Sequence, residues 1–209
     1  MKKEEGIVPK KEIKAVLFDM DGVLVDSLDA WFHTYNDALK SFGFKELGKK
    51  EFAKGFGSPI EQDINDHFIG KTVKEVANRY NANFIKRKKL VKIFPESKKI
   101  LSELKKRKIK LALLTNSTTF IALSILKHHK IRKYFDVILA MEDVKKRKPA
   151  PDMVLKACKK LGVKPKNAII VGDTMNDMIA GKRAGCITVG YTIKGDYMVD
   201  KLKEIYKLI

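Results

Sequence analysis

The sequence has few cysteines and only one glutamine. The first shortage limits the roles of its thiols, and the second indicates the kind of protein to which the composition belongs. The two cysteines, Cys158 and Cys186, lie far apart, form no Cys-x-x-Cys motif and have no flanking histidine. This argues against a disulfide or a metal role, and we expect two small buried thiols. The single glutamine, Gln62, in a chain rich in lysine is the composition of a heat-adapted protein.

Long hydrophobic runs are also missing. No apolar stretch approaches the length that crosses a membrane, so we expect no membrane partner. The first five residues are charged or polar apart from Met1, and no apolar segment of the signal-peptide type follows them. Residues 1–12 predict a polar, loosely held tail that contains Pro9. These features favour a cytoplasmic protein.

Acidic residues are scarce relative to basic ones. The chain has 44 Lys and Arg against 25 Asp and Glu, a formal net charge of +19, with basic runs at 86–89, 105–108 and 145–148. Such a field attracts anions, including nucleic acid. However, no alternation of aromatic and basic residues and no zinc-finger spacing accompanies the charge. We therefore do not expect nucleic acid as the partner.

What is present is an alternation of apolar segments with polar turns. A chain of 209 residues with 44% hydrophobic residues can form one core, or a core that carries a smaller insert. The pattern predicts a strand over 13–19, then helices over 28–42, 49–54, 60–68 and 72–92 with no strand between 26 and 95. After Pro95 we expect a helix near 100–104, strands at 110–114, 136–140, 167–172 and 186–190, and helices at 118–129, 151–161, 175–184 and 197–208.

This order predicts an α/β fold, a doubly wound parallel sheet with helices on both faces. The helical stretch is too long for one crossover connection, so it indicates an insertion. We expect residues 1–25 and 95–209 to form an α/β core and residues 26–94 to form a helical cap.

Two carboxylates follow the first predicted strand, in Phe18-Asp19-Met20-Asp21-Gly22. Gly22 permits a sharp turn there, so Asp19 and Asp21 lie at the carboxyl edge of the sheet, where open α/β sheets bind ligands. Asp-x-Asp-Gly also opens calcium loops. The sequence argues against a calcium loop, because Val23, Val25 and Ala30 occupy positions where such a loop needs oxygen ligands.

The stretch from Asp19 to Ser27 resembles the first motif of the haloacid dehalogenase superfamily, Asp-x-Asp-Gly-(Val/Thr)-(Leu/Ile)-x-Asp-Ser. The resemblance implies that Asp19 is the nucleophile that accepts a phosphoryl group. It implies that Asp21 is the general acid and base.

Two further segments resemble the second and third motifs of the same family. Leu113-Leu114-Thr115-Asn116-Ser117 ends a predicted strand, and its hydroxyl and amide groups can donate to anionic oxygens, although alone it could be a helix cap. The resemblance implies that Thr115 holds the transferring phosphoryl group and that Asn116 assists. In Lys148-Pro149-Ala150-Pro151-Asp152 it implies that Lys148 neutralises Asp19 and a substrate oxygen.

The fourth motif is Gly172-Asp173-Thr174-Met175-Asn176-Asp177, after the predicted strand 167–172. Oxygen ligands of this kind suit Mg²⁺, and Asp19, the backbone carbonyl of Asp21 and Asp173 could supply them. The resemblance implies that Asp173 is a metal ligand and that Asp177 supports the metal site. It also implies that the first strand lies beside strand 167–172, which brings Asp19 and Asp173 together.

The four motifs together imply a Mg²⁺-dependent phosphatase that hydrolyses a small phosphorylated metabolite, with phosphoglycolate favoured, through an aspartyl-phosphate. A mutase like β-phosphoglucomutase shares this residue set and stays open. A dehalogenase is disfavoured because that branch lacks the residue that Asp21 matches, and a phosphonate hydrolase would need a cap lysine, for which only Lys54 is near. A nucleic-acid-binding or regulatory protein without catalysis is the alternative from a different class.

Overall fold

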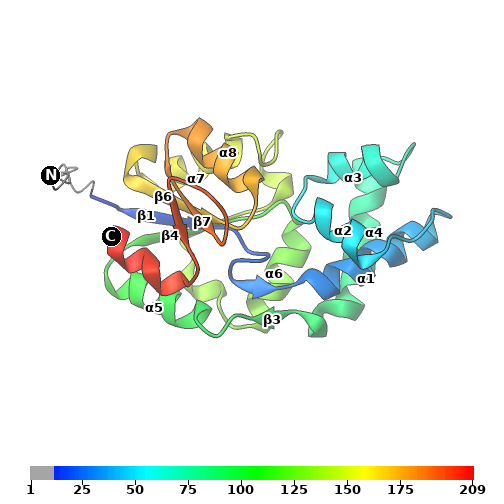
Figure 1. The fold of residues 1–209 in the computed structure, drawn as a ribbon, viewed down its shortest axis with the longest axis horizontal. Helices are drawn as coiled ribbons and strands as arrows, with labels where there is room; N and C mark the ends of the chain where they lie inside the picture. The colour runs from blue at the N-terminus through cyan, green and yellow to red at the C-terminus, as the bar shows by residue number, and fades with distance from the viewer. Residues whose placement is uncertain (1–11) are drawn as a thin grey trace, which may run out of the picture.

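A six-stranded parallel sheet forms the centre of the protein in the computed structural model, which describes residues 12–209 (Figure 1). Residues 1–11 of the expected tail lie outside the described residues. The strand order is β5-β4-β1-β6-β7-β8. The strands are β1 (Ala15–Phe18), β4 (Lys110–Leu114), β5 (Val137–Leu139), β6 (Ala168–Gly172), β7 (Ile187–Tyr191) and β8 (Tyr197–Val199). Every neighbouring pair is parallel, which confirms the predicted fold class.

Helices cover both faces of the sheet, and the central strand β1 shows why its sequence is apolar throughout. Ala15 and Leu17 pack on the side of α7 (Asp152–Leu161) and α8 (Met175–Ala184). Val16 and Phe18 pack on the side of α5 (Ser97–Lys106) and α6 (Thr119–His128). Since neighbouring side chains of a strand point to opposite faces, both sets must be apolar, and all four are fully buried.

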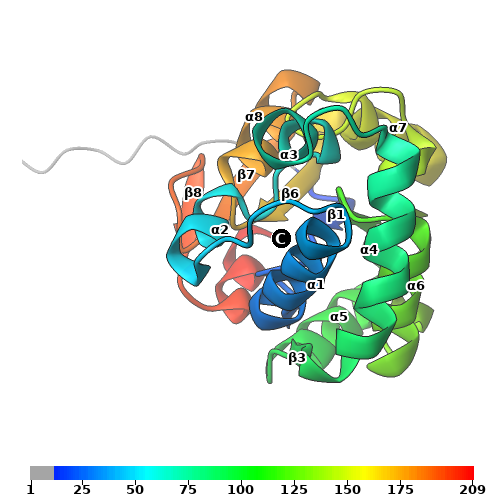
Figure 2. The same ribbon diagram turned by 90° about the vertical axis from the view of Figure 1, so that its right-hand side faces the viewer.

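Four helices form the other end of the molecule, beyond the carboxyl ends of the strands (Figures 1 and 2). They are α1 (Leu28–Ser41), α2 (Lys49–Gly55), α3 (Ile60–His67) and α4 (Val73–Arg87). Aromatic side chains fill the space between them: the ring centroids of Trp31 and Tyr80 are 5.5 Å apart, and those of Tyr35 and Phe68 are 5.1 Å apart. We call residues 26–94 the cap segment.

The prediction that no strand lies between residues 26 and 95 is wrong. A two-stranded antiparallel ribbon, β2 (Val25–Asp26) and β3 (Lys92–Ile93), joins the two ends of the cap segment. Two-residue strands are too short to show an alternating pattern. The helix predicted to 92 ends as α4 at Arg87, and a 3₁₀ turn, Lys88–Leu90, follows it.

The helix expected over 197–208 is also wrong in its first part. Tyr197–Val199 is β8, which extends the sheet beside β7, and only Leu202–Leu208 is helical, as a 3₁₀ helix. Tyr and Val favour strands, and the edge of the sheet was available to pair with them. Short 3₁₀ turns also occur at Arg132–Tyr134, Met141–Asp143 and Pro165–Asn167.

Both cysteines are buried thiols, as predicted from the sequence. Cys158 and Cys186 are both free and buried. The interaction between the two thiols raises the pKa of Cys186, with burial adding to the rise, and lowers the pKa of Cys158. Within residues 12–209, none of the helices has the length and apolar character needed to cross a membrane.

Candidate active site

The carboxyl ends of β1 and β6 bring Asp19 and Asp173 together. The two strands pair in register, with Phe18 opposite Val171, and the chain continues from β1 into the turn at Gly22. Gly22 has φ of 78°, and a Cβ at this position would lie 1.9 Å from Asp173 Oδ2. Any other residue would therefore strain the backbone and displace Asp173. The sheet order expected from the resemblance is confirmed.

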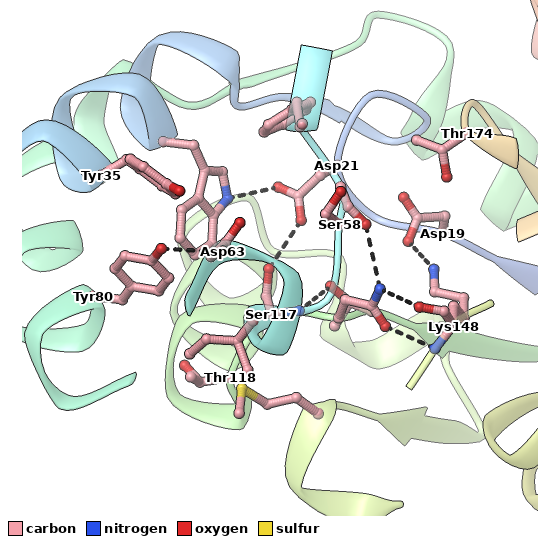
Figure 3. Close-up of a pocket in the computed structure, with 18 of the residues that line it drawn as sticks. Asp19, Asp21, Tyr35, Ser58, Asp63, Tyr80, Ser117, Thr118, Lys148 and Thr174 are labelled. Carbon is pink, nitrogen blue, oxygen red and sulfur yellow. Dashed lines mark hydrogen bonds and ion pairs between the residues drawn. The ribbon is translucent and has the colours of Figure 1, made fainter. Parts of the chain in front are cut away.

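Lys148 lies between Asp19 and Asp177 on the floor of the site, and Figure 3 shows its contact with Asp19. Its ammonium donates hydrogen bonds to Asp19 Oδ1 and Asp177 Oδ1, both at 2.6 Å, and to the carbonyl of Leu114 at 3.0 Å. Burial lowers the pKa of Lys148, but the charges of Asp177 and Asp19 outweigh it and raise that pKa above its ordinary value. The lysine therefore stays cationic.

The charge of this cluster is still unbalanced. Burial raises the pKa of Asp19 well above its usual range, Lys148 opposes that rise, and Asp177 and Asp173 add to it. In Asp173, burial first and then the charge of Asp177 raise the pKa to about 7. One ammonium thus faces three carboxyl groups, and a further cation would relieve their repulsion.

Three hydrogen-bond donors hold the side chain of Asp21. Ser27 Oγ and Trp31 Nε1 donate to Oδ1, the latter at 3.3 Å, and Ser117 Oγ donates to Oδ2 at 3.2 Å. Figure 3 shows the contact between Ser117 and Asp21. Burial raises the pKa of Asp21, and these hydrogen bonds lower it again. The carboxyl group is therefore fixed in orientation while it keeps a raised pKa, which is the environment of a general acid.

Thr115 and Asn116 leave β4 side by side but have different contacts. The Thr115 hydroxyl is almost fully buried and accepts a hydrogen bond from the Ser117 N–H at 3.0 Å. The Asn116 side chain accepts from the Lys148 N–H at 3.1 Å and donates to the carbonyls of Lys148 at 3.0 Å and Gly57 at 3.3 Å. Asn116 thus positions the backbone of Lys148 and touches the cap segment.

Asp19, Asp173 and Asp177 form an acidic group in which one oxygen from each lies within 4.8 Å of the others. Asp173 Oδ1 is buried and has no hydrogen-bond partner within the described residues. An orphaned buried oxygen beside two other carboxylates fits a hard cation such as Mg²⁺. Asp177 also accepts from Thr174 Oγ1 at 2.6 Å, so both of its oxygens are already hydrogen-bonded and it suits a supporting position.

A cavity of about 70 Å³ lies above this floor and beneath the cap segment. The turn between α2 and α3 lines it through Gly55, Phe56, Gly57 and Ser58. The predicted site residues that also line it are Asp19, Asp21, Thr115, Asn116, Lys148 and Asp177. Asp173 lies behind Gly22 and does not line the cavity, and neither does the exposed Lys54.

The sequence patterns do not predict that Trp31 binds Asp21 or that Asp63 of the cap segment lines the cavity. Trp31 lies within the helix predicted over 28–42, and that prediction does not show that its indole N–H reaches Asp21. Asp63 of α3 lines the cavity and accepts a hydrogen bond from Tyr80 at 2.9 Å. For Trp31, the one sequence feature that could have indicated this role is its position, since the single tryptophan lies one helical turn after Ser27. No sequence feature distinguishes Asp63 from other acidic residues of the chain.

Comparisons with known proteins agree with this geometry. The family model described as haloacid dehalogenase-like hydrolase matches residues 16–191. Pyrophosphatase PpaX of Bacillus velezensis is 31% identical over 207 residues, covering 93% of this chain and 95% of the relative. Phosphoglycolate phosphatase of Photorhabdus laumondii is 29% identical, covering 90% and 83%.

The solved structures include a HAD-superfamily hydrolase from Geobacter sulfurreducens, 25% identical, with a TM-score of 0.78 and coverage of 94% of this chain and 100% of that one. The family match spans both the first strand and the fourth motif, and the four motifs meet at one cavity. The chain therefore belongs to the haloacid dehalogenase-like hydrolase family.

Proposed function

We propose that this hydrolase is a Mg²⁺-dependent phosphatase that cleaves a small phosphomonoester through an aspartyl-phosphate. The observation that carries the proposal is the 2.6 Å contact between Lys148 Nζ and Asp19 Oδ1 at the floor of a cavity that Asp21 also lines. The names of two relatives, pyrophosphatase and phosphoglycolate phosphatase, describe phosphate-releasing enzymes and support the same class.

In the first half of the reaction, an oxygen of Asp19 attacks phosphorus and the bond to the leaving oxygen breaks. Asp21 gives its proton to that oxygen, so the leaving group departs as a neutral hydroxyl. Lys148 holds Asp19 near an anionic phosphoryl group, and the Thr115 hydroxyl lines the same cavity and can donate to a phosphoryl oxygen.

In the second half, Asp21 takes a proton from water. The hydroxide attacks phosphorus, the bond between phosphorus and the Asp19 oxygen breaks, and phosphate leaves. Asp19 is then a carboxylate again, and Asp21 again carries the proton that the next cycle needs. Bound Mg²⁺, held by Asp19, the Asp21 carbonyl and Asp173 with Asp177 in support, would supply positive charge for the phosphoryl oxygens.

We further propose that residues 26–94 act as a cap domain on a core made of the remaining chain. The cap segment leaves and rejoins the core through the paired strands β2 and β3, so its two connections lie side by side. Gly57 at its inner turn accepts hydrogen bonds from Asn116 and Asn176 of the core, both at 3.3 Å. Such contacts close the cavity and keep bulk water from the phosphorylation step.

The test is release of phosphate from p-nitrophenyl phosphate, with Mg²⁺ and with excess EDTA. We expect turnover with the metal and none with the chelator. A panel with phosphoglycolate and pyrophosphate would then define the substrate, and conversion of a sugar phosphate to its isomer instead of free phosphate would identify a mutase. If no phosphate ester is hydrolysed, the result would favour a nucleic-acid-binding or regulatory protein without catalysis.

A further inference from the structure

The cap segment places a carboxyl group in the cavity, on the side away from Lys148. Asp63 and Tyr80 lie at one side of the close-up in Figure 3 and Lys148 at the other, with Asp21 and Ser117 between them. All five residues line the cavity. Since the phosphoryl group must lie at Asp19 beside Lys148, the leaving group of a bound phosphomonoester points toward Asp63.

Asp63 has one oxygen available for a ligand. Its Oδ2 accepts a hydrogen bond from the Tyr80 hydroxyl at 2.9 Å, and Oδ1 has no partner in the part of the chain that the structure describes. A carboxylate oxygen in a cavity accepts hydrogen bonds from hydroxyl or ammonium groups, and it repels other carboxylates and phosphates.

No cation compensates Asp63 on this side. Among the described residues, Lys148 is the one cationic side chain that lines the cavity, and Asp19 and Asp177 already bind it. Arg147, which precedes Lys148 in the sequence, forms an ion pair with Glu61 and does not line the cavity. A leaving group with its own negative charge would therefore lose its hydration without gaining a partner.

Aromatic rings complete this end of the cavity, which Trp31, Tyr35, Phe52, Phe56 and Tyr80 line. Ring faces attract cations and pack against short alkyl chains. A leaving group with a short alkyl chain and an ammonium group therefore fits this end of the cavity.

We propose that Asp63 is a specificity-determining residue that favours small phosphomonoesters whose leaving group carries an ammonium or a hydroxyl group, and disfavours those whose leaving group is anionic. The inference rests on the proposed phosphatase function. It reverses the preference for phosphoglycolate that the family resemblance implies, because glycolate brings a second carboxylate toward Asp63.

The experiment uses four phosphomonoesters with the same two-carbon skeleton: 2-aminoethyl, 2-hydroxyethyl, ethyl and carboxymethyl phosphate. For the wild-type protein with Mg²⁺ we expect kcat/KM to be highest for the aminoethyl and hydroxyethyl esters and lowest for the carboxymethyl ester. The ratio between the aminoethyl and carboxymethyl esters should be at least about tenfold, the equivalent of one lost ionic contact.

Asp63→Asn removes the charge and keeps the shape, and we expect it to reduce this ratio to about twofold or less. Glu51→Gln is the matched control, because Glu51 is an exposed carboxylate on the preceding helix α2 and does not line the cavity. The control should keep the wild-type ratio. Thermal unfolding of both variants reports whether they fold.

A pH series of the same ratio gives a second readout. Burial, with Asp66 adding to it and the Tyr80 hydrogen bond opposing it, raises the pKa of Asp63 to about 7. The other titratable and charged groups around it are Tyr35 of α1, Tyr80 of α4, Asp66 and His67 of α3, and Asp21 across the cavity. As the pH falls through about 7, Asp63 gains a proton, so the preference for the aminoethyl ester should shrink in the wild type and stay flat in Asp63→Asn.

Equal kcat/KM values of the wild-type protein for the carboxymethyl and aminoethyl esters would overturn the inference. So would an equal loss on all four esters in Asp63→Asn. Either result leaves the proposed function intact as long as p-nitrophenyl phosphate is hydrolysed. Failure of the proposed function would show instead as no turnover of any ester, including p-nitrophenyl phosphate.

Discussion

Lys148 and Asp19 are 129 residues apart in the sequence, and a hydrogen bond of 2.6 Å joins them. The contact depends on the sheet order, because Asp19 follows β1 whereas Lys148 comes from the loop after β5, two strands away. Asn116 fixes the Lys148 backbone through two hydrogen bonds, so the loop is tied to the strand between them. The contact between Lys148 and Asp19 therefore depends on β4, the strand that lies between β1 and β5.

The first prediction concerns the nucleophile. Asp19→Asn should lower phosphate release from p-nitrophenyl phosphate by at least about a thousandfold, because an amide cannot attack phosphorus. Asp29→Asn is the control, since Asp29 lies on the surface in an ion pair with Lys49. A purified, folded Asp19→Asn protein that keeps more than about a tenth of the wild-type rate would contradict the nucleophile assignment.

The second prediction concerns the general acid. Asp21→Asn should slow the cleavage of alkyl phosphates much more than that of p-nitrophenyl phosphate, because a good leaving group needs no proton. Single-turnover formation of the aspartyl-phosphate separates this step from hydrolysis of the intermediate. Equal losses for both leaving groups in that step would show that Asp21 acts in some other way.

The third prediction concerns the buried cation. Lys148→Met should destabilise the metal-free protein by about 3–5 kcal/mol, because it leaves Asp19 and Asp177 buried without a counter-charge. Lys105→Met is the matched control, since Lys105 pairs with Asp136 at the surface and should cost no more than about 1 kcal/mol. Urea unfolding in EDTA measures both. Equal destabilisation of the two variants would mean that Lys148 is not needed to balance the cluster.

The fourth prediction concerns the net charge of +19. Raising the salt concentration should lower kcat/KM for a doubly charged phosphate ester more than it lowers kcat, because screening weakens the encounter and leaves the closed complex largely unaffected. Stopped assays over a salt series measure both constants. Tight binding of RNA or DNA that resists salt would instead favour the nucleic-acid alternative.

The extent to which this site could be predicted differs from residue to residue. Asp19, Thr115 and Asp173 each follow an apolar strand, so their place at the carboxyl edge follows from strand periodicity and parallel topology. Lys148 lies in a loop among other basic residues and had no such signal. Only the family resemblance singled it out.

The structure of the cap segment was harder to predict from the sequence than that of the parallel sheet. The predicted helices 28–42, 49–54 and 60–68 agree closely with α1, α2 and α3 because their apolar spacing is regular. The helix predicted over 72–92 extends beyond the end of α4 at Arg87, and β2 and β3 are too short to show a pattern. Asp63 looks like an ordinary acidic residue in the first turn of α3, a position that the helix dipole favours in any case. Its contact with Tyr80 depends on how α3 packs against α4, which periodicity does not specify.

The last prediction concerns the turn between α2 and α3. Phe56 and Ser58 line the cavity from this turn, while Asp19, Asp173 and Asp177, which we propose to hold the metal, lie outside the cap segment. Phe56→Ala and Ser58→Ala should therefore change the relative kcat/KM of different phosphomonoesters by about tenfold, as expected for lost contacts in a binding pocket.

The same two variants should leave the Mg²⁺ affinity nearly unchanged. Ser41→Ala is the control in the cap segment, because the Ser41 hydroxyl donates to the carbonyl of Ala38, its one partner among residues 12–209, and does not line the cavity. Isothermal titration with Mg²⁺ and a substrate panel measure the two properties separately. If the turn variants altered metal affinity as strongly as substrate preference, or altered neither, the turn would not line the closed site during catalysis, and specificity would have to come from α1, α3 and α4.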